Sequence, residues 1–214
     1  MEALKTKLRN LKLSGMVKSL ESRNQFALDN KASYIEFIEL LVEDETVNRQ
    51  ANSFNKRLKT SRLNTQKDLD SFDFNYQPEL DKANLMDLAA CRFIQQKRNI
   101  VLMGNPGTGK THLANALGIE AIKKGYHVLF LHINDLIDKF NTANADGTKN
   151  RLIRQLTNLH LLILDELGFK KLPNDAIDDF FEVIRKRYET GSMIITSNRN
   201  FEDWGAIFGD YTMA

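Results

Sequence analysis

The apolar positions over residues 1 to about 70 recur at the spacing of amphipathic helices. One series consists of Leu4, Leu8, Leu11 and Met16, and a second of Ile35, Ile38, Leu41 and Val42. Apolar residues three to four positions apart lie on one face of a helix. Ser33 followed by Glu36 has the spacing of a capping box, which predicts a helix beginning at this point. Because no strand pattern occurs here, the sequence predicts a helical N-terminal domain over residues 1–70.

After Arg98 the pattern changes to short apolar runs without clean alternation. These runs are 100–103, 128–131, 161–164 and 193–195, and each is followed by a loop and a helical pattern. Such runs are typical of parallel strands that are covered on both faces and joined by crossover helices. The sequence therefore predicts an α/β module with a parallel sheet. Residues 81–96 are predicted to form one helix, and 71-SFDFNYQPEL-80 an ordered linker, because aromatic residues and a proline interrupt the periodicity there.

Residues 104-GNPGTGKT-111 match the phosphate-binding pattern G-x-x-x-x-G-K-[ST] in full. They follow a predicted strand and open a predicted helix, which is the context that this motif requires. The glycines allow backbone N–H groups and the helix N-terminus to face a phosphate chain. Lys110 adds a positive charge for the β- and γ-phosphates, and Thr111 offers a hydroxyl to Mg²⁺. We therefore expect ATP and Mg²⁺ as cofactors, bound by Gly104, Asn105, Pro106, Gly107, Thr108, Gly109, Lys110 and Thr111.

Two adjacent carboxylates, Asp165 and Glu166, follow the apolar run 161–164. At the carboxyl end of a strand next to the phosphate-loop strand, they would face the same crevice as the loop. Asp165, with Thr111, suits the Mg²⁺ shell through water, because Mg²⁺ gives up its waters reluctantly. Glu166 suits the polarisation of an attacking water in phosphoryl transfer. Asn198 follows the next strand and could reach the γ-phosphate or this water, although asparagine is also a common turn residue. The predicted catalytic residues are Glu166, Asn198 and Lys110.

Basic residues are segregated along the chain, although the formal net charge is only +2. Residues 49–67 contain six lysines and arginines and no acid, whereas acids cluster over 36–45. Lysine and arginine contacts to phosphates would give sequence-independent DNA binding that weakens with salt. The alternative is a solvated helix face beside the acidic cluster. The DNA-binding candidates in this stretch are Lys56, Arg57, Lys59 and Arg62.

Composition argues against several classes of protein. No apolar run approaches the roughly 18 residues of a membrane span, and the N-terminus lacks the continuous apolar segment of a secretory signal. The single cysteine, Cys91, can form no internal disulfide, which fits a reducing compartment. We therefore expect a cytoplasmic protein without a membrane partner, in which Cys91 is buried and unreactive.

Four segments together resemble the IstB helper ATPases of insertion-sequence transposition, an AAA+ group in the DnaA/DnaC initiator and helicase-loader clade. They are GNPGTGKTHLA, LLILDELGF, the stretch RYETGSMIITSNRNFEDWGAIFGD and the preceding FDFNYQ linker. The first two mark only a P-loop ATPase, whereas the stretch from Arg187 to Asp210 makes the resemblance specific. The likeness implies a five-stranded parallel sheet with a helical lid, ATP at the interfaces of a homo-oligomer, and assembly on duplex DNA that is handed to a transposase.

The resemblance adds further candidate residues. Tyr76 and Gln77 are similar to the linker that packs against the adenine ring in related ATPases. Residues 133–160 fit the place where this clade inserts extra helices. Asp146-Gly147 would end the first of these helices, and the second would begin after it. In the resembling families this element faces the DNA path, which makes Lys149, Arg151 and Arg154 DNA-binding candidates. Two solvated arginines on an ordinary crossover helix are the alternative.

The same resemblance places a fifth strand, lid helices and an arginine that reaches a neighbour's ATP site beyond Ala214. Residues 201–214 contain no arginine. We therefore expect an α/β fold in which 81–214 form an AAA+ core without its C-terminal strand and lid. The phosphate-loop strand would then have an open edge, and this Mg-dependent ATPase would hydrolyse ATP slowly and assemble poorly on DNA.

Three functions are consistent with the sequence. The first is a DNA-binding ATPase that oligomerises on duplex DNA and recruits a transposase. The second is a replicative helicase loader, which would use the same ATPase site on single-stranded DNA. The third is a nucleotide-switched DNA scaffold, in which ATP binding drives assembly and hydrolysis matters little.

Overall fold

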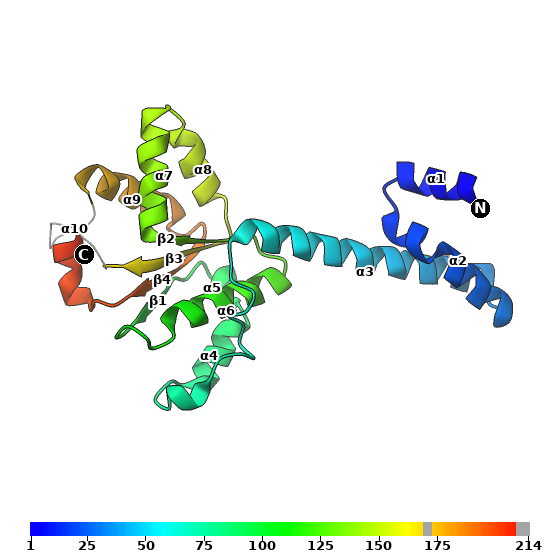
Figure 1. Ribbon diagram of the computed structural model, residues 1–214, viewed down its shortest axis with the longest axis horizontal. Helices are drawn as coiled ribbons and strands as arrows, with labels where there is room; N and C mark the ends of the chain where they lie inside the picture. Colours follow the sequence, from blue (N-terminus) through cyan, green and yellow to red (C-terminus); the bar gives the residue numbers. More distant parts are fainter. Residues whose placement is uncertain (169–172, 209–214) are drawn as a thin grey trace. The chain divides into compact units, whose positions relative to one another are not determined.

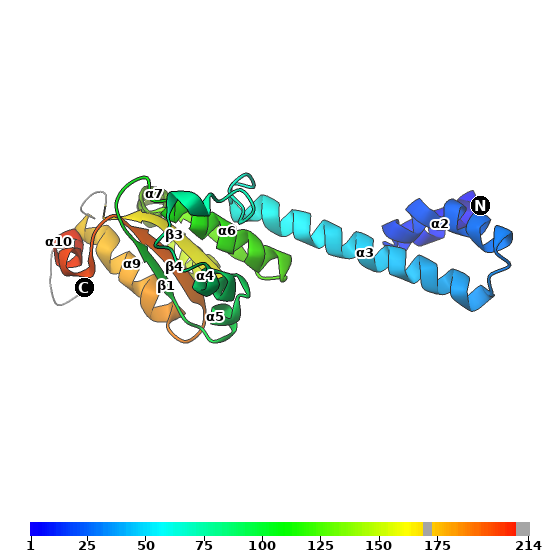
Figure 2. The same cartoon turned by 90° about the horizontal axis from the view of Figure 1, so that it is seen from below.

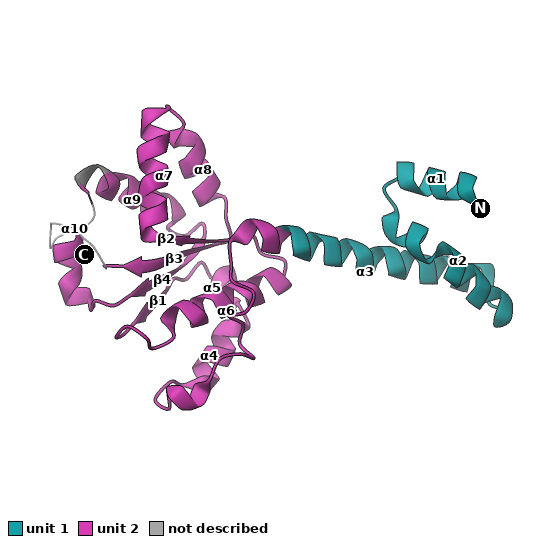
Figure 3. Ribbon diagram, in the orientation of Figure 1, with its two compact units in different colours: residues 1–56 teal, residues 57–214 magenta. Residues whose placement is uncertain are grey.

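The computed structural model describes residues 1–168 and 173–208 (Figure 1). It contains two compact units, Met1–Lys56 and Arg57–Ala214 (Figure 3). The boundary lies within helix α3 (Tyr34–Ser61), upstream of the boundary that the sequence predicts after residue 70. The assignment of DNA or partner binding to the first unit stays a prediction. In the described part of the chain, no helix is both long enough and apolar enough to cross a membrane.

The first unit is formed by α1 (Glu2–Asn10), α2 (Ser14–Asp29) and most of α3. The predicted capping box begins α3: the Ser33 N–H donates to Glu36 Oε2 at 2.6 Å, and the Glu36 N–H donates to Ser33 Oγ at 3.2 Å. Each residue therefore satisfies a backbone donor that the first turn of a helix would otherwise leave without a partner. The sequence signal was local, and the prediction is confirmed.

Polar contacts hold α2 against α3 in this small unit. The Gly15 N–H donates to Glu45 Oε2 at 2.6 Å, and the buried Glu45 also accepts a hydrogen bond from Arg49 Nε at 2.6 Å. Arg23 binds Asp44 through both carboxylate oxygens, at 2.7 and 2.8 Å. These hydrogen bonds lower the pKa of Asp44 to about 2. A charge-assisted bidentate pair fixes the relative position of two helices more strictly than apolar contact alone.

A four-stranded sheet forms the centre of the second unit, and its strand order is β1-β4-β3-β2. The strands are β1 (Ile100–Met103), β2 (Val128–His132), β3 (Leu161–Leu167) and β4 (Ser192–Ser197). All three pairs of neighbouring strands are parallel, which confirms the predicted sheet. One expectation is wrong: β3, which carries the two carboxylates, is not the neighbour of β1. β4 lies between them, so three strand ends contribute to the edge where the phosphate loop begins.

Helices cover both faces of the sheet, and Figure 2 shows α6 and α9 on opposite sides of it. Besides the end of α3, the helical segments of this unit in the described residues are η1 (Phe74–Tyr76), α4 (Lys82–Ala89), α5 (Arg92–Gln95), α6 (Lys110–Lys123), α7 (Ile133–Ala145), α8 (Lys149–Thr157), α9 (Asn174–Arg187), η2 (Phe201–Asp203) and α10 (Trp204–Phe208). Alternate strand residues, among them Leu129, Leu162 and Ile195, pack into one core with α7, α8 and α9. The opposite face receives α6: a Cβ at Gly118 of that helix would lie 2.8 Å from Ile163 Cδ1. Burial on both faces explains why the strands read as continuous apolar runs.

The predicted helix over 81–96 is in fact two helices, α4 and α5. Cys91 separates them because it adopts a left-handed conformation, with φ of 59°. Its thiol is buried, as expected, and burial raises the pKa of Cys91 to about 11. The break between α7 and α8 lies at Asp146-Gly147, where the sequence predicts it.

Arg187, at the end of α9, connects α8 to the sheet. Its guanidinium is buried and donates to the carbonyl oxygens of Leu156 and Ser192, each at 2.6 Å. Burial lowers the pKa of Arg187 to about 10. Because these carbonyls belong to the last turn of α8 and the first residue of β4, the arginine fixes the position of α8 relative to β4.

Candidate active site

The phosphate loop joins β1 to α6 at the carboxyl edge of the sheet. Gly109 immediately precedes the helix and has φ of 85°, a conformation that costs a side-chain-bearing residue roughly 1–2 kcal/mol. A Cβ at this position would also lie 2.8 Å from Phe72 Cε2. Glycine is therefore required here both by the turn and by the ring that covers it. The turn leaves the first N–H groups of α6 at the loop, where an anion would satisfy them.

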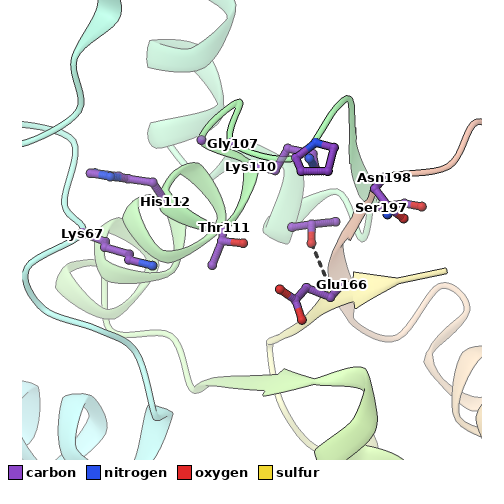
Figure 4. Close-up of a pocket in the computed structure, with 11 residues that line it drawn as sticks. Lys67, Gly107, Lys110, Thr111, His112, Glu166, Ser197 and Asn198 are labelled. Carbon is purple, nitrogen blue, oxygen red and sulfur yellow. Dashed lines mark hydrogen bonds between the residues drawn. The ribbon is translucent and has the colours of Figure 1, made fainter. Parts of the chain in front are cut away.

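A cavity of about 430 Å³ lies beside this loop (Figure 4). The loop and the first turn of α6 line it from Pro106 to His112. The ends of β3 and β4 contribute Glu166, Thr196, Ser197 and Asn198, and Lys67 reaches it from the segment that follows α3. Its volume falls within the range of roughly 300–1,000 Å³ that is usual for ligand sites. The structure thus brings Lys110, Thr111, Glu166 and Asn198 to one cavity, as the sequence suggests.

Lys110 lies over its own loop. Its Nζ donates to the carbonyl oxygens of Gly104 at 2.7 Å and Asn105 at 2.8 Å. Burial lowers the pKa of Lys110, against an opposing effect of the Asp165 charge. These carbonyls are neutral acceptors, so a phosphate oxygen in the cavity would be the stronger partner for the ammonium group.

Asp165 is completely buried and accepts hydrogen bonds from two threonines. Thr111 Oγ1 donates to Asp165 Oδ1 at 2.9 Å and also lies 3.1 Å from Oδ2, while Thr196 Oγ1 donates to Oδ1 at 2.6 Å. A hydroxyl that lines the cavity and a buried carboxylate behind it therefore meet, although they come from different elements. Hydroxyl and carboxylate oxygens are the hard ligands that Mg²⁺ takes, directly or through water, so these residues fit that ion.

Glu166 occupies a bulge in β3 and has a left-handed backbone, with φ of 65°. Leu164 pairs with Ile195 and Leu167 with Ser197, so two residues of β3 stand opposite the single residue Thr196 of β4. The Glu166 N–H donates to Thr196 Oγ1 at 2.9 Å, which holds the bulge to β4. Bulges of this kind redirect side chains next to active sites. Here the result is an exposed carboxylate on the wall of the cavity.

Sequence reasoning missed three residues in or near this site. Thr196 bonds Asp165 and Glu166 but reads in the sequence as an ordinary strand residue. His132 ends β2, and its Nδ1 lies 3.3 Å from Asp165 Oδ2 and 3.9 Å from Glu166 Oε2. A polar residue at the end of an apolar run was the available signal for His132. The sequence around Lys67 gave no signal for this site, because Lys67 lies far upstream of the phosphate loop, among other basic residues.

The predicted adenine contacts, Tyr76 and Gln77, stay a prediction. Tyr76 and Gln77 are not among the described residues that line the cavity, and Tyr76 is 74% exposed. Asp73 caps the short helix η1 by accepting the Asn75 N–H at 2.9 Å, and this helix turns the chain after Phe72. Phe72 is the linker residue that reaches the loop, and its ring packs edge-on against His112 with centroids 5.2 Å apart.

The DNA-binding candidates lie on two elements outside the cavity lining. Arg151 and Arg154 are exposed on α8. The ammonium group of Lys149 forms an ion pair with the buried Asp179 of α9, which links the two helices, and its DNA-binding role stays a prediction. Lys56, Arg57 and Lys59 lie in the last turns of α3, and Arg62 directly follows that helix.

The chain is similar in sequence to proteins of insertion sequences. A family model described as IstB-like ATP binding protein matches residues 6–214. A Pseudomonas aeruginosa protein of insertion sequence IS21 is 36% identical over 214 residues, which cover 100% of this chain and 81% of the relative. A Geobacillus stearothermophilus protein of insertion sequence IS5376 is 38% identical over 204 residues, or 95% of this chain and 81% of the relative. The names of both relatives refer to ATP binding.

The fold is similar to that of replication proteins. DnaA from Aquifex aeolicus, solved with AMPPCP bound, matches 70% of this chain and 46% of its own with a TM-score of 0.61 and 25% identity. A DnaC helicase loader matches 68% of this chain and 89% of its own with a TM-score of 0.58 and 22% identity. These likenesses confirm the predicted P-loop AAA+ fold.

Proposed function

Because this chain belongs to the family of IstB-like ATP-binding proteins, we propose that it is a Mg-dependent ATPase that assembles on duplex DNA and recruits a transposase. One observation carries the enzymatic part of this proposal. The phosphate loop and the exposed Glu166 line one cavity at the carboxyl edge of the sheet, and the buried Asp165 is hydrogen-bonded to two further lining residues, Thr111 and Thr196. If the two acids served only to form ion pairs within the fold, Glu166 would not need to face an open cavity. Phosphoryl transfer does need an acid there, to act on the attacking water.

The phosphate chain of ATP would bind against the loop. The N–H groups at the start of α6 would donate to its oxygens, and Lys110 would exchange its carbonyl partners for the β- and γ-phosphates. Mg²⁺, held by Thr111 and by Asp165 through water, would neutralise part of the phosphate charge. Thr196 would keep Asp165 in place through its hydrogen bond of 2.6 Å.

Glu166 would act on the attacking water. Its carboxylate accepts a proton as the water oxygen bonds to the γ-phosphorus and the bond to the leaving ADP oxygen breaks. Asn198, at the end of β4, would donate to the γ-phosphate or orient this water. Since the bulge alone directs the carboxylate of Glu166 into the cavity, hydrolysis would depend on the pairing of β3 with β4.

DNA binding and transposase recruitment rest on different support. The relatives are named for insertion sequences, which makes a transposase the expected partner. Arg151 and Arg154 are exposed on α8 and would contact DNA phosphates without sequence preference. Assembly of several copies, with ATP between them, would place these contacts along the duplex.

A helicase loader on single-stranded DNA and a scaffold that does not need hydrolysis remain the competing functions. The likeness to a DnaC helicase loader favours the first of these at the level of the fold. A mobility-shift comparison of duplex and single-stranded DNA, each with ATP, ADP or no nucleotide, separates the duplex-binding ATPase from the helicase loader. Glu166→Gln separates the scaffold, whose functional cycle this substitution would leave intact. We expect ATP-stimulated binding to duplex DNA and its loss in Lys110→Ala. Preference for single strands would refute the duplex proposal, and ATP-stimulated binding by Lys110→Ala would refute the nucleotide site.

A further inference from the structure

Lys67 is a second lysine in the nucleotide cavity, and it comes from outside the sheet and the phosphate loop. Its side chain is half-buried and lines the cavity together with Lys110 and Thr111. Figure 4 shows it beside His112 and Thr111, on the side of the cavity away from Asn198. No motif in the sequence assigns a role to this residue.

The segment that carries Lys67 is fastened to α6 on both sides of the lysine. Upstream, the Asn64 N–H donates to Asn115 Oδ1 at 2.9 Å, and Asn115 Nδ2 donates in turn to the Thr111 carbonyl at 2.8 Å. Downstream, His112 Nε2 donates to the Asp68 carbonyl at 2.7 Å. The partners of this segment therefore lie in the first two turns of the helix that begins at the phosphate loop.

Apolar contacts hold the same segment at its two ends. Leu63 packs on Gly118, where an added Cβ would lie 2.8 Å from Leu63 Cδ2. Phe72 packs on Gly109 in the phosphate loop. With both ends and the residues around Lys67 fixed, the backbone at Lys67 is held beside the cavity, which reduces the entropy lost when the lysine binds a ligand.

The ammonium group of Lys67 has no hydrogen-bond or ion-pair partner among the residues that the structure describes. Lys110, in contrast, is bound to loop carbonyls. Two cationic side chains on one small cavity repel each other unless an anion lies between them. A polyphosphate supplies several negative oxygens and is the ligand chemistry that satisfies both groups.

We propose that Lys67 is a second cationic contact to the phosphate chain of the bound nucleotide. This inference rests on the proposed function, because it takes ATP to be the ligand of the cavity. The contact would also connect the bound nucleotide to α3, since the segment 62–72 directly follows that helix. A phosphate bound to Lys67 would add a further attachment between this segment and the start of α6.

Equilibrium binding of a fluorescent ATP analogue and the matching ADP analogue, with Mg²⁺ and without DNA, tests the proposal. We expect Lys67→Met to weaken ATP binding about tenfold, the effect of losing one charge-assisted hydrogen bond at a partly exposed site. The loss for ADP should be no larger. Lys67→Arg keeps the charge and should restore most of the affinity. Lys124→Met is the matched control, because Lys124 is exposed at the opposite end of α6.

A charge effect and a structural effect of the substitution differ in their salt dependence. If Lys67 contacts phosphate, the ATP affinity of Lys67→Met should fall less steeply with salt than that of the unmodified chain. Equal ATP affinity and equal salt dependence in Lys67→Met and Lys124→Met would overturn the inference about Lys67 but not the proposed function. Failure of the unmodified chain to bind ATP would instead overturn the proposed function together with it. Unchanged thermal unfolding without nucleotide verifies that the variants fold.

Discussion

Replacing Thr196 by valine removes one hydroxyl from the active site and nearly keeps the shape of the side chain. The hydroxyl donates to Asp165 Oδ1 at 2.6 Å and accepts the Glu166 N–H at 2.9 Å. Thr196 is 1% exposed and Asp165 is fully buried, so solvent does not reach the Asp165 carboxylate to replace the lost hydroxyl. The substitution therefore tests whether this hydroxyl holds the bulge of β3 against β4.

The expected loss of stability follows from the two hydrogen bonds. A hydrogen bond to a charged group contributes roughly 1.5–3 kcal/mol, and a buried donor left without a partner costs roughly 1–3 kcal/mol. The lower ends apply, because Thr111 still donates to Asp165 and the Glu166 N–H is only partly buried. We expect Thr196→Val to lower the free energy of unfolding by about 2.5 kcal/mol, a large part of the roughly 5–15 kcal/mol usual for a domain.

Urea unfolding followed by the fluorescence of Trp204 measures this loss. Trp204 is the single tryptophan of the chain and is buried in the second unit, so its signal reports on the unit that holds the site. Thr196→Ser keeps the hydroxyl and removes one methyl group, which costs about 1 kcal/mol. If valine and serine destabilise the protein equally, the hydroxyl does not hold the bulge and the assigned role is wrong.

Three further predictions concern other parts of the molecule. Glu166→Gln should retain ATP affinity, slow hydrolysis and prolong the DNA-bound state; unchanged turnover in an ATPase assay would place the base elsewhere. Arg151→Ala with Arg154→Ala should weaken binding to all DNA sequences and reduce the salt slope by about one per residue, with nucleotide affinity unchanged; an unaltered slope would exclude α8 from the DNA path. Gly109→Ala should lower the melting temperature more than Gly125→Ala, since both have positive φ but only Gly109 has a ring within 4 Å of the added Cβ; equal losses would show that backbone strain alone acts.

The sequence predicted the strands well because β2, β3 and β4 are buried between two helical layers and the edge strand β1 is half-buried. A strand between two such layers must be apolar on both faces, so it stands out as a short continuous run. β1 has the predicted bounds, and β2 and β4 extend beyond theirs by polar or small residues at their ends. β3 also extends beyond its predicted run, because Asp165 and Glu166 end the apolar pattern although pairing continues to Leu167. A polar residue ends an apolar pattern but does not by itself end a strand.

The phosphate loop could be predicted because its function depends on residues that are adjacent in the sequence. The other parts of the site depend on which strand lies beside which. The order β1-β4-β3-β2 places Thr196 opposite the bulge and His132 beside Asp165, and no local pattern encodes that order. Lys149 illustrates the converse: its charge suggested DNA, but its partner Asp179 on α9 is visible only in the folded chain.

The bulge also explains how two adjacent acids can have different roles. In a regular strand, successive side chains point to opposite faces, so only one of the two would face a given helical layer. The extra residue and the left-handed φ of 65° at Glu166 change this arrangement. Asp165 is fully buried against two hydroxyls, whereas the side chain of Glu166 is 55% exposed at the cavity. A buried, hydrogen-bonded carboxylate suits a fixed metal shell, and an exposed one suits proton transfer with water. The division of proposed roles therefore depends on Thr196 of β4 as much as on the Asp-Glu pair itself.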